Sequence, residues 1–182
     1  MNDEEIALSL QQGNSEALAH LIERHHSRLV GYLYLMLDGD RPQAEDFAQE
    51  AFLKMVQAIA KYTYPRPFKP WLYAIAVNLV RNYHARAERR QTSIDENGFD
   101  KMPDGAGAME EDISRQGDIE HMLRLLRRLS APQREAILLR YVEGLSLAEI
   151  AELQDVPVGT VKSRISTGLS MLRTLMQKED DQ

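Results

Sequence analysis

The sequence contains no cysteine, only one tryptophan and no long hydrophobic run. Without cysteine, no disulfide framework can hold the fold together. The first residues, Met1 to Glu5, form neither a basic nor an apolar segment, so they do not predict an export signal. No segment approaches the roughly 20 apolar residues of a membrane-spanning helix. We therefore expect a soluble, cytoplasmic chain of 182 residues, enough for one ordinary domain or two small ones.

Motifs typical of enzymes are also missing. The sequence has no phosphate-binding glycine loop, no dinucleotide-binding glycine pattern and no nucleophile elbow. His20, Glu23, His25 and His26 include one Glu-x-x-His spacing, which is half of a di-iron carboxylate site. The chain has no second copy of that spacing. We therefore expect no catalytic activity of its own, no cofactor and no metal.

The distribution of charge is more informative than its total. A formal net charge of −6 argues at first against a nucleic-acid partner, because Lys and Arg neutralise phosphates. Residues 91–118, however, hold eight acids and two cations, so this segment alone carries −6. Two basic stripes remain: residues 78–90 hold four arginines against one acid, and residues 157–176 hold three cations and no acid. The stripes are compatible with nucleic-acid binding.

The acidic segment also divides the chain. Apolar residues at helical spacing stop there, because Gly98, Pro103, Gly105 and Gly107 interrupt the pattern. We interpret residues 92–117 as a flexible acidic linker. On both sides apolar residues recur at helical spacing, without the alternation of strands. The predicted fold is all-α: two small helical domains, residues 1–91 and 118–182, joined by this linker, with a helix-turn-helix in the second.

Polar faces are predicted on two helices of the first domain. After a turn at residues 38–42, one helix buries a stripe that includes Phe47 and turns an acidic face to solvent. Pro70 suits the first turn of a later helix that reaches about Arg90. That helix carries an amide pair beside arginines on one face, a set suited to exposed bases and phosphates. In both helices the plainer interpretation is an ordinary solvated face.

The segment between these two helices has an unusual composition. Residues 61–69 combine aromatic rings, cations and two stiffening prolines. Such a loop can hold a base that has flipped out of a DNA duplex. The alternative is a structural connection in which Tyr62 or Phe68 packs inward, and the two interpretations are compatible.

Helix boundaries are clearest in the second domain. Ser130 and Gln133 match a capping box with Pro132 in the first turn, and Ser146 and Glu149 match a second capping box. The second box opens a short helix over residues 147–153, and a turn at residues 154–157 precedes a final helix with a polar outer side. A short helix, a tight turn and an exposed polar helix form a helix-turn-helix, whose second helix fits the DNA major groove.

Three motifs in this order resemble those of extracytoplasmic-function sigma factors, of the sigma-70 family. Residues 129–141 (LSAPQREAILLRY), 144–151 (GLSLAEIA) and 157–164 (PVGTVKSR) resemble the region that reads the promoter −35 element. Residues 44–53 (AEDFAQEAFL) resemble the helix that binds the polymerase clamp. Residues 68–78 (FKPWLYAIAVN) resemble the segment that melts and reads the −10 element. The resemblance covers nearly the whole chain.

The resemblance implies an alternative sigma factor that directs core RNA polymerase to specific promoters and promotes DNA melting. It assigns binding of core polymerase to Asp46, Gln49, Glu50 and Leu53. It assigns −10 DNA contacts to Tyr62, Tyr64, Lys69, Asn78, Arg81, Asn82, Arg86 and Arg89. It assigns −35 DNA contacts to Gly159, Thr160, Lys162, Ser163, Arg164, Ser166 and Thr167.

The partners implied by the resemblance are core RNA polymerase, through its β′ clamp and β subunits, promoter DNA and an anti-sigma factor. An anti-sigma factor of this kind often resides at the inner membrane, where it would hold a sigma factor that does not itself insert. The sequence departs from the family in three places: Asp155 stands where Gly is frequent in the turn, fewer arginines follow Arg164, and Gly168 interrupts the final helix. The expected cost of that glycine is roughly 1 kcal/mol relative to Ala.

Two other classes of protein remain as alternatives. A response-regulator-type transcription factor shares the C-terminal helix-turn-helix, but its receiver domain alternates strands and helices, whereas residues 6–90 are predicted to be helical. A helical adaptor could use the basic faces to bind an acidic protein. Promoter-directed transcription with added core polymerase separates the three classes.

Overall fold

The computed structural model describes residues 1–91 and 110–180, and every regular element in these ranges is a helix. The predicted all-α fold is therefore confirmed. The elements in chain order are α1 (Asp3–Gln11), α2 (Glu16–Met36), α3 (Arg41–Ala58), η1 (Ile59–Lys61), α4 (Phe68–Gln91), α5 (Glu110–Arg127), α6 (Ala131–Ile137), the π-helix η2 (Leu138–Val142), α7 (Leu147–Gln154) and α8 (Val158–Asp180).

Most of the predicted linker falls on residues 92–109, which lie outside the described residues. Helix α5 begins at Glu110, inside the range predicted for the linker. The division into two domains by that linker stays a prediction. None of the described helices is long and apolar enough to cross a membrane.

Local hydrogen bonds explain where several helices begin. Asp40 caps α3 by accepting from the Gln43 amide at 3.0 Å. In the predicted capping box of α7, Ser146 Oγ accepts from the Glu149 amide at 3.2 Å, and the Glu149 carboxylate accepts from the Ser146 amide at 2.7 Å. At the start of α6, Gln133 accepts from the Ser130 amide at 3.1 Å. Both sequence signals therefore mark real helix starts.

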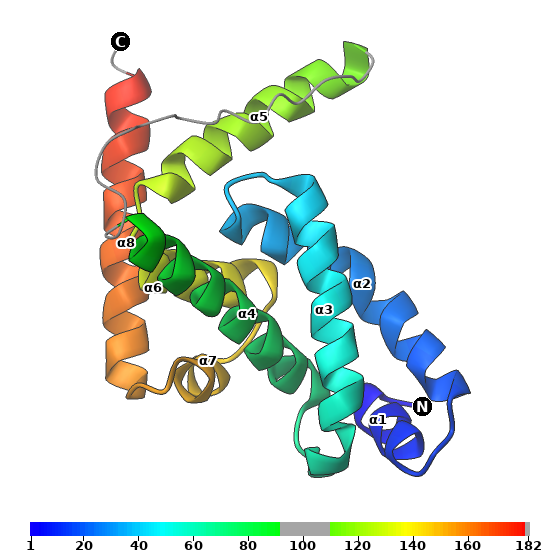
Figure 1. Cartoon of the computed structure of the whole chain (residues 1–182). Helices are drawn as coiled ribbons and strands as arrows, with labels where there is room; N and C mark the ends of the chain where they lie inside the picture. Colours follow the sequence, from blue (N-terminus) through cyan, green and yellow to red (C-terminus); the bar gives the residue numbers. More distant parts are fainter. Residues whose placement is uncertain (92–109, 181–182) are drawn as a thin grey trace.

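The first half of the chain forms a bundle in which α2, α3 and α4 pack together, with α1 across one end (Figure 1). Its core contains large side chains from each of these helices, such as Leu21, Leu33, Met55 and Leu72. In the second half, α6, α7 and α8 pack on one another, and α8 runs along the edge of the molecule farthest from α1 (Figure 1). Helices α3 and α8 therefore lie on different sides of the molecule (Figure 1).

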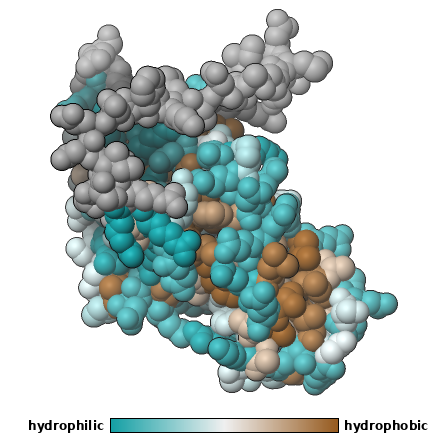
Figure 2. Space-filling view, in the orientation of Figure 1, coloured by the Kyte–Doolittle hydropathy of each residue, from teal (hydrophilic) through white to brown (hydrophobic). Residues whose placement is uncertain are grey.

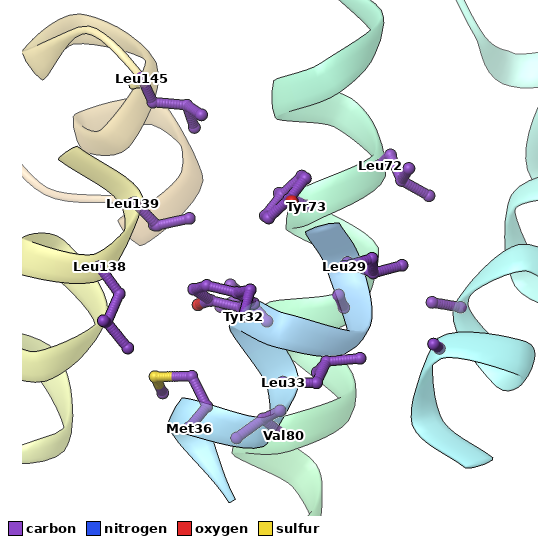
Figure 3. Close-up of a cluster of buried hydrophobic side chains, with 14 of the residues drawn as sticks. Leu29, Tyr32, Leu33, Met36, Leu72, Tyr73, Val80, Leu138, Leu139 and Leu145 are labelled. Atoms are coloured by element: carbon purple, nitrogen blue, oxygen red, sulfur yellow. The ribbon is translucent and has the colours of Figure 1, made fainter. Parts of the chain in front are cut away.

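The two halves share a buried contact. Tyr32 of α2 and Tyr73 of α4 are fully buried, with their ring centroids 5.3 Å apart. Leu138 and Leu139 of η2 and Leu145 of the following loop approach these rings from the second half (Figure 3). Burial raises the pKa of both tyrosines well above their usual value. The apolar surfaces of the halves therefore cover each other in this structure.

Gly168 has a packing role that its position in a helix did not reveal. It is buried where α8 crosses α6, and a Cβ atom there would lie 2.7 Å from Ile137 Cδ1. A larger residue could fit only if Ile137 moved. The glycine lets the two helix backbones approach closely, and this contact offsets its low helix propensity.

Candidate nucleic-acid and partner interfaces

The residues assigned to polymerase binding share one exposed face of α3. Asp46, Gln49, Glu50 and Leu53 follow the i, i+3, i+4, i+7 spacing, and all four are exposed. Leu53 is 64% exposed and Val56 is 36% exposed. Figure 2 shows a hydrophobic patch on the side of the molecule where α2 and α3 run. The α3 face, defined as these five residues, therefore joins acidic, amide and apolar groups.

The α3 face is held only weakly by the rest of the molecule. Glu50 lies 3.5 Å from Lys54 one turn along the helix, and both side chains are about half exposed. An exposed pair of this kind contributes less than about 1 kcal/mol to folding. The face is therefore free to contact another protein.

The loop at residues 61–67 is built around a buried tyrosine. Tyr62 is 3% exposed, and its ring lies 5.2 Å from that of Trp71 and 6.0 Å from that of Phe68. Its hydroxyl donates to the Arg66 carbonyl. Burial, and then the nearby Glu4 carboxylate, raises the pKa of Tyr62 to about 12. In this arrangement the ring has no free face for a DNA base.

Tyr64 occupies the opposite situation in the same loop. It stands between Tyr62 and Pro65 in the sequence, and it is 45% exposed. Of the two loop tyrosines assigned to −10 DNA, it is the one with a ring that a base could stack on. The inward-packing alternative thus describes Tyr62 and Phe68, which are both buried.

The polar face predicted on α4 is exposed, but its cations differ. Asn78, Asn82, Arg86 and Arg89 all reach the surface. Arg81 is exposed as well, but it forms two hydrogen bonds with the Glu135 carboxylate of α6, at 2.6 and 3.2 Å. Lys69 Nζ lies 3.0 Å from Glu143 Oε2, beyond η2. Two residues assigned to −10 DNA are thus paired with acids of the other half.

The helix-turn-helix forms as the sequence predicts. Helix α7 ends at Gln154, and Asp155 adopts a left-handed conformation with φ 53° and ψ 50°. The Val156 amide then donates to the Ala151 carbonyl at 3.0 Å, which closes the helix end. Asp tolerates this conformation, which normally favours Gly, and α8 begins at Val158.

Helix α8 turns most of its assigned residues outward. Lys162, Ser163, Ser166, Thr167 and Gly159 are exposed, and Thr160 is partly buried. Val161 and Ile165 face the core, as the apolar spacing predicts. Farther along the helix Met176 is 51% exposed, so the inward apolar stripe does not continue to the end of α8.

Arg164 does not point outward with the other α8 residues. Its Nη1 atom donates to Gln154 Oε1 of α7 at 2.8 Å. The Gln154 Nε2 atom in turn donates to Glu135 Oε1 at 2.8 Å, and the same oxygen accepts from Arg81 Nη2. Three hydrogen bonds therefore connect Arg81 of α4 to Arg164 of α8. We call Arg81, Glu135, Gln154 and Arg164 the relay.

Further charged contacts join the two halves beside the relay. Arg134 Nη1 lies 2.6 Å from Asp38 Oδ1, and Arg127 donates to the Asp38 carbonyl at 2.7 Å. Glu135 and Glu143 are 3% and 6% exposed. Glu135 directly precedes the apolar run 136–139, and a carboxylate beside such a run is the sequence signal that could have suggested a buried ion pair. The identity of their partners is not visible in sequence.

The histidines near the N-terminus have structural contacts. His25 is buried and its Nε2 atom lies 2.8 Å from Asp3 Oδ2. His26 stacks on Phe52, with ring centroids 6.3 Å apart. Within residues 1–91 and 110–180, no group of three or more His, Cys, Asp or Glu residues is arranged to hold a metal ion.

Two family models match the chain, one in each half. The model described as Sigma-70 region 2 matches residues 21–90, and that described as Sigma-70, region 4 matches residues 119–172. The ECF RNA polymerase sigma-E factor of Haemophilus influenzae is 30% identical over 184 residues, which cover 97% of this chain and 96% of the relative. The ECF RNA polymerase sigma-E factor of Escherichia coli K12 is 32% identical over 173 residues, or 91% and 89% of the two chains.

Solved structures share the fold of the chain. CnrH, solved in complex with the cytosolic domain of CnrY, matches with a TM-score of 0.74 and 22% identity over 97% of each chain. RpoE from Bartonella quintana, solved with the anti-sigma factor NepR, matches with a TM-score of 0.65 and 22% identity, covering 87% of this chain and 97% of RpoE. Helices of both halves therefore have counterparts in known folds.

Proposed function

This chain belongs to the extracytoplasmic-function family of RNA polymerase sigma factors, and on that basis we propose how its surfaces serve promoter recognition. It is an alternative sigma factor for promoter-specific transcription. Core polymerase binds the α3 face, −10 DNA binds the 61–67 loop and α4, and −35 DNA binds α8. The observation that carries this division is the exposure of an acidic and apolar α3 face apart from the helix-turn-helix, which a stand-alone DNA-binding protein would not require.

The α3 face suits a protein partner rather than DNA. Asp46 and Glu50 would repel phosphates, while Leu53 and Val56 offer apolar surface at the same place. Carboxylates one turn apart can pair with arginines of a partner, and the adjacent apolar side chains can be buried by the same contact. We assign this face to the β′ clamp of core polymerase.

The outer face of α8 suits the DNA major groove. One helix fits the groove, and hydroxyl and cationic side chains can reach base edges and phosphates. Lys162, Ser163, Ser166 and Thr167 have this exposure. In the free chain Arg164 donates a hydrogen bond to Gln154, and it becomes available to DNA only when that bond breaks.

Reading both promoter elements requires a change in the arrangement of the halves. The −35 and −10 elements are named for their positions on the DNA, which differ by about 25 base pairs. At 3.4 Å per base pair this separation is about 85 Å. Arg81 and Arg164 are connected here by only three hydrogen bonds. One chain cannot hold both residues on their DNA elements in this arrangement. The halves therefore separate when the promoter is bound.

The exposed groups on α4 and the loop act at the −10 element after duplex opening. Tyr64 offers a ring for stacking, and Asn78 and Asn82 offer amides for base edges. Such contacts need bases that have left the duplex, so they favour the melted state over the closed one. Promotion of melting follows from this preference. Arg86 and Arg89 lie farther along α4, where they can follow the phosphate backbone.

An anti-sigma factor is the proposed regulatory partner. The matched RpoE structure contains one, named NepR. In this chain such a partner would compete with polymerase for the α3 face or stabilise the closed arrangement of the halves. A partner that resides in the inner membrane would then hold this chain there.

Run-off transcription tests the function directly. Core polymerase is supplied with a genomic promoter library, with and without the full-length chain. A sigma factor produces defined transcripts only when it is present, whereas a response regulator or an adaptor produces none with core enzyme alone. The absence of chain-dependent transcripts, with a polymerase shown to be active with another sigma factor, would reject the proposal.

A further inference from the structure

Both ends of the 61–67 loop are tied to α1. Gln11, the last residue of α1, donates through Nε2 to three backbone carbonyls, those of Ile59 at 3.0 Å, Ala60 at 3.3 Å and Tyr62 at 2.9 Å. These carbonyls lie at and just after the end of η1, where carbonyls lack helical N–H donors, although that of Ile59 also accepts from the Tyr62 amide. At the other end of the loop, Glu4 Oε1 accepts from the Phe68 amide at 3.1 Å, at the first residue of α4.

Helix α1 is itself fixed to the bundle. Asp3 lies 2.8 Å from both Arg24 and His25 of α2. Partial burial opposes ionisation of Asp3, but the bonds from Arg24 and His25 outweigh it and hold the pKa of that carboxyl below its usual value. Ile6 and Ala7, on the inner side of α1, are buried. Helix α1, which carries Glu4 and Gln11, is therefore fixed against the bundle.

The tie points set the shape of the loop from outside it. Gln11 donates to the carbonyl of buried Tyr62 at the start of the loop, and Glu4 accepts from the Phe68 amide at its end. Within the loop, Tyr62 bonds to Arg66, so the short segment that carries Tyr64 is closed on itself. A loop with fixed ends and a fixed base presents one ring in one place, and such preorganisation favours one bound base over others.

We propose that Gln11 and Glu4 are specificity-determining positioning residues, which set base preference in −10 DNA without touching it. This inference rests on the proposed −10 role of the loop. The ligand is an unpaired base of −10 DNA, held against Tyr64. Because the three carbonyls bound by Gln11 are only partly buried, water can replace the amide when it is lost. The fold then persists, and the loop gains freedom.

The test measures base preference rather than affinity. Holoenzyme, made from core polymerase and the full-length chain, selects from a pool of forked duplexes with a short random single-stranded overhang, and the selected strands are sequenced. Gln11→Met keeps the length of the side chain but removes its donors. It should flatten the preference at one overhang position by about fivefold, because a loop with more freedom no longer holds Tyr64 in one place. Gln12→Met, at the exposed neighbouring residue, should keep the parental profile.

Glu4 supplies a second and independent arm. Glu4→Gln retains an oxygen that can accept from the Phe68 amide, so it should keep the parental preference. Glu4→Met removes the acceptor and should flatten the same overhang position as Gln11→Met. A merely structural role would not distinguish Gln from Met by base preference while the melting temperature stays the same.

The outcomes separate the inference from the proposed function. If the parental holoenzyme shows no base preference in the overhang, the −10 role of the chain is wrong. If the parent has a preference that survives in both Met variants, the positioning role of α1 is wrong. Uniform weakening at every overhang position, or loss of core binding, would also overturn the positioning role, because it would show a general effect on folding.

Discussion

Replacement of Asp46 and Glu50 by Ala separates a sigma factor from a stand-alone DNA-binding protein. Both side chains lie on the α3 face, and the helix beneath them is held by buried residues such as Ala48 and Met55. Alanine has the highest helix propensity, so the double substitution does not weaken α3. The change therefore removes charge from the surface and leaves the core intact.

The structure gives different magnitudes for folding and for binding. Glu50 has one partner, Lys54 at 3.5 Å, and an exposed pair of this type is worth less than about 1 kcal/mol. For a chain of this size that is a shift of less than about 4 °C in melting temperature. A charged contact buried at an interface costs about 2–5 kcal/mol when one partner is removed. Even about 2 kcal/mol in total weakens binding roughly thirtyfold.

The assay is a titration of labelled chain with core RNA polymerase, together with thermal unfolding of each variant. Glu45→Ala is the matched control, because it removes a carboxylate from the same helix and breaks the pair with Arg41 at 3.0 Å. We expect the control to bind like the parent and the double variant to bind at least about thirtyfold more weakly, which corresponds to loss of one interface contact. Equal affinity of the double variant and the parent would show that the α3 face does not contact polymerase.

Three further predictions concern the DNA-binding surfaces. Lys162→Ala should reduce the slope of log binding constant against log salt concentration by about one unit in holoenzyme, because one phosphate contact is lost; an unchanged slope would remove Lys162 from the backbone contacts. Asn78→Ala with Asn82→Ala should reduce permanganate reactivity of the −10 region more than it reduces initial promoter binding, and normal melting would contradict their role. Glu135→Met, which removes both acceptor oxygens, should release Arg81 and raise the affinity of the chain without polymerase for single-stranded −10 DNA by about fivefold; unchanged affinity would show that the ion pair does not keep Arg81 from DNA.

The helix-turn-helix could be predicted from sequence because its signals are local. Ser146 and Glu149 form their capping box three residues apart, and Asp155 sits where the turn needs a left-handed residue. The outward direction of Lys162 follows from the spacing of apolar residues on the same helix. Each of these features depends on residues within one or two helical turns, so tertiary contacts did not change them.

The cation partners and the loop interior could not be predicted in the same way. Arg81 and Glu135 are 54 residues apart, and an exposed arginine face gives no sign of an acid on another helix. Tyr62 and Tyr64 are equivalent by composition, yet Phe68 and Trp71 cover one ring and leave the other exposed. These features depend on which surfaces meet across the molecule, and composition does not determine that.

Under the proposed function, the relay makes binding to DNA depend on two separate sequences together. Separation of the halves breaks the same bonds whether DNA then occupies one surface or both. Breaking these bonds costs free energy. DNA with both elements offsets the cost with two sets of contacts, whereas DNA with one element has a single set. A half-matched sequence therefore has to meet the whole cost of separation with one set of contacts.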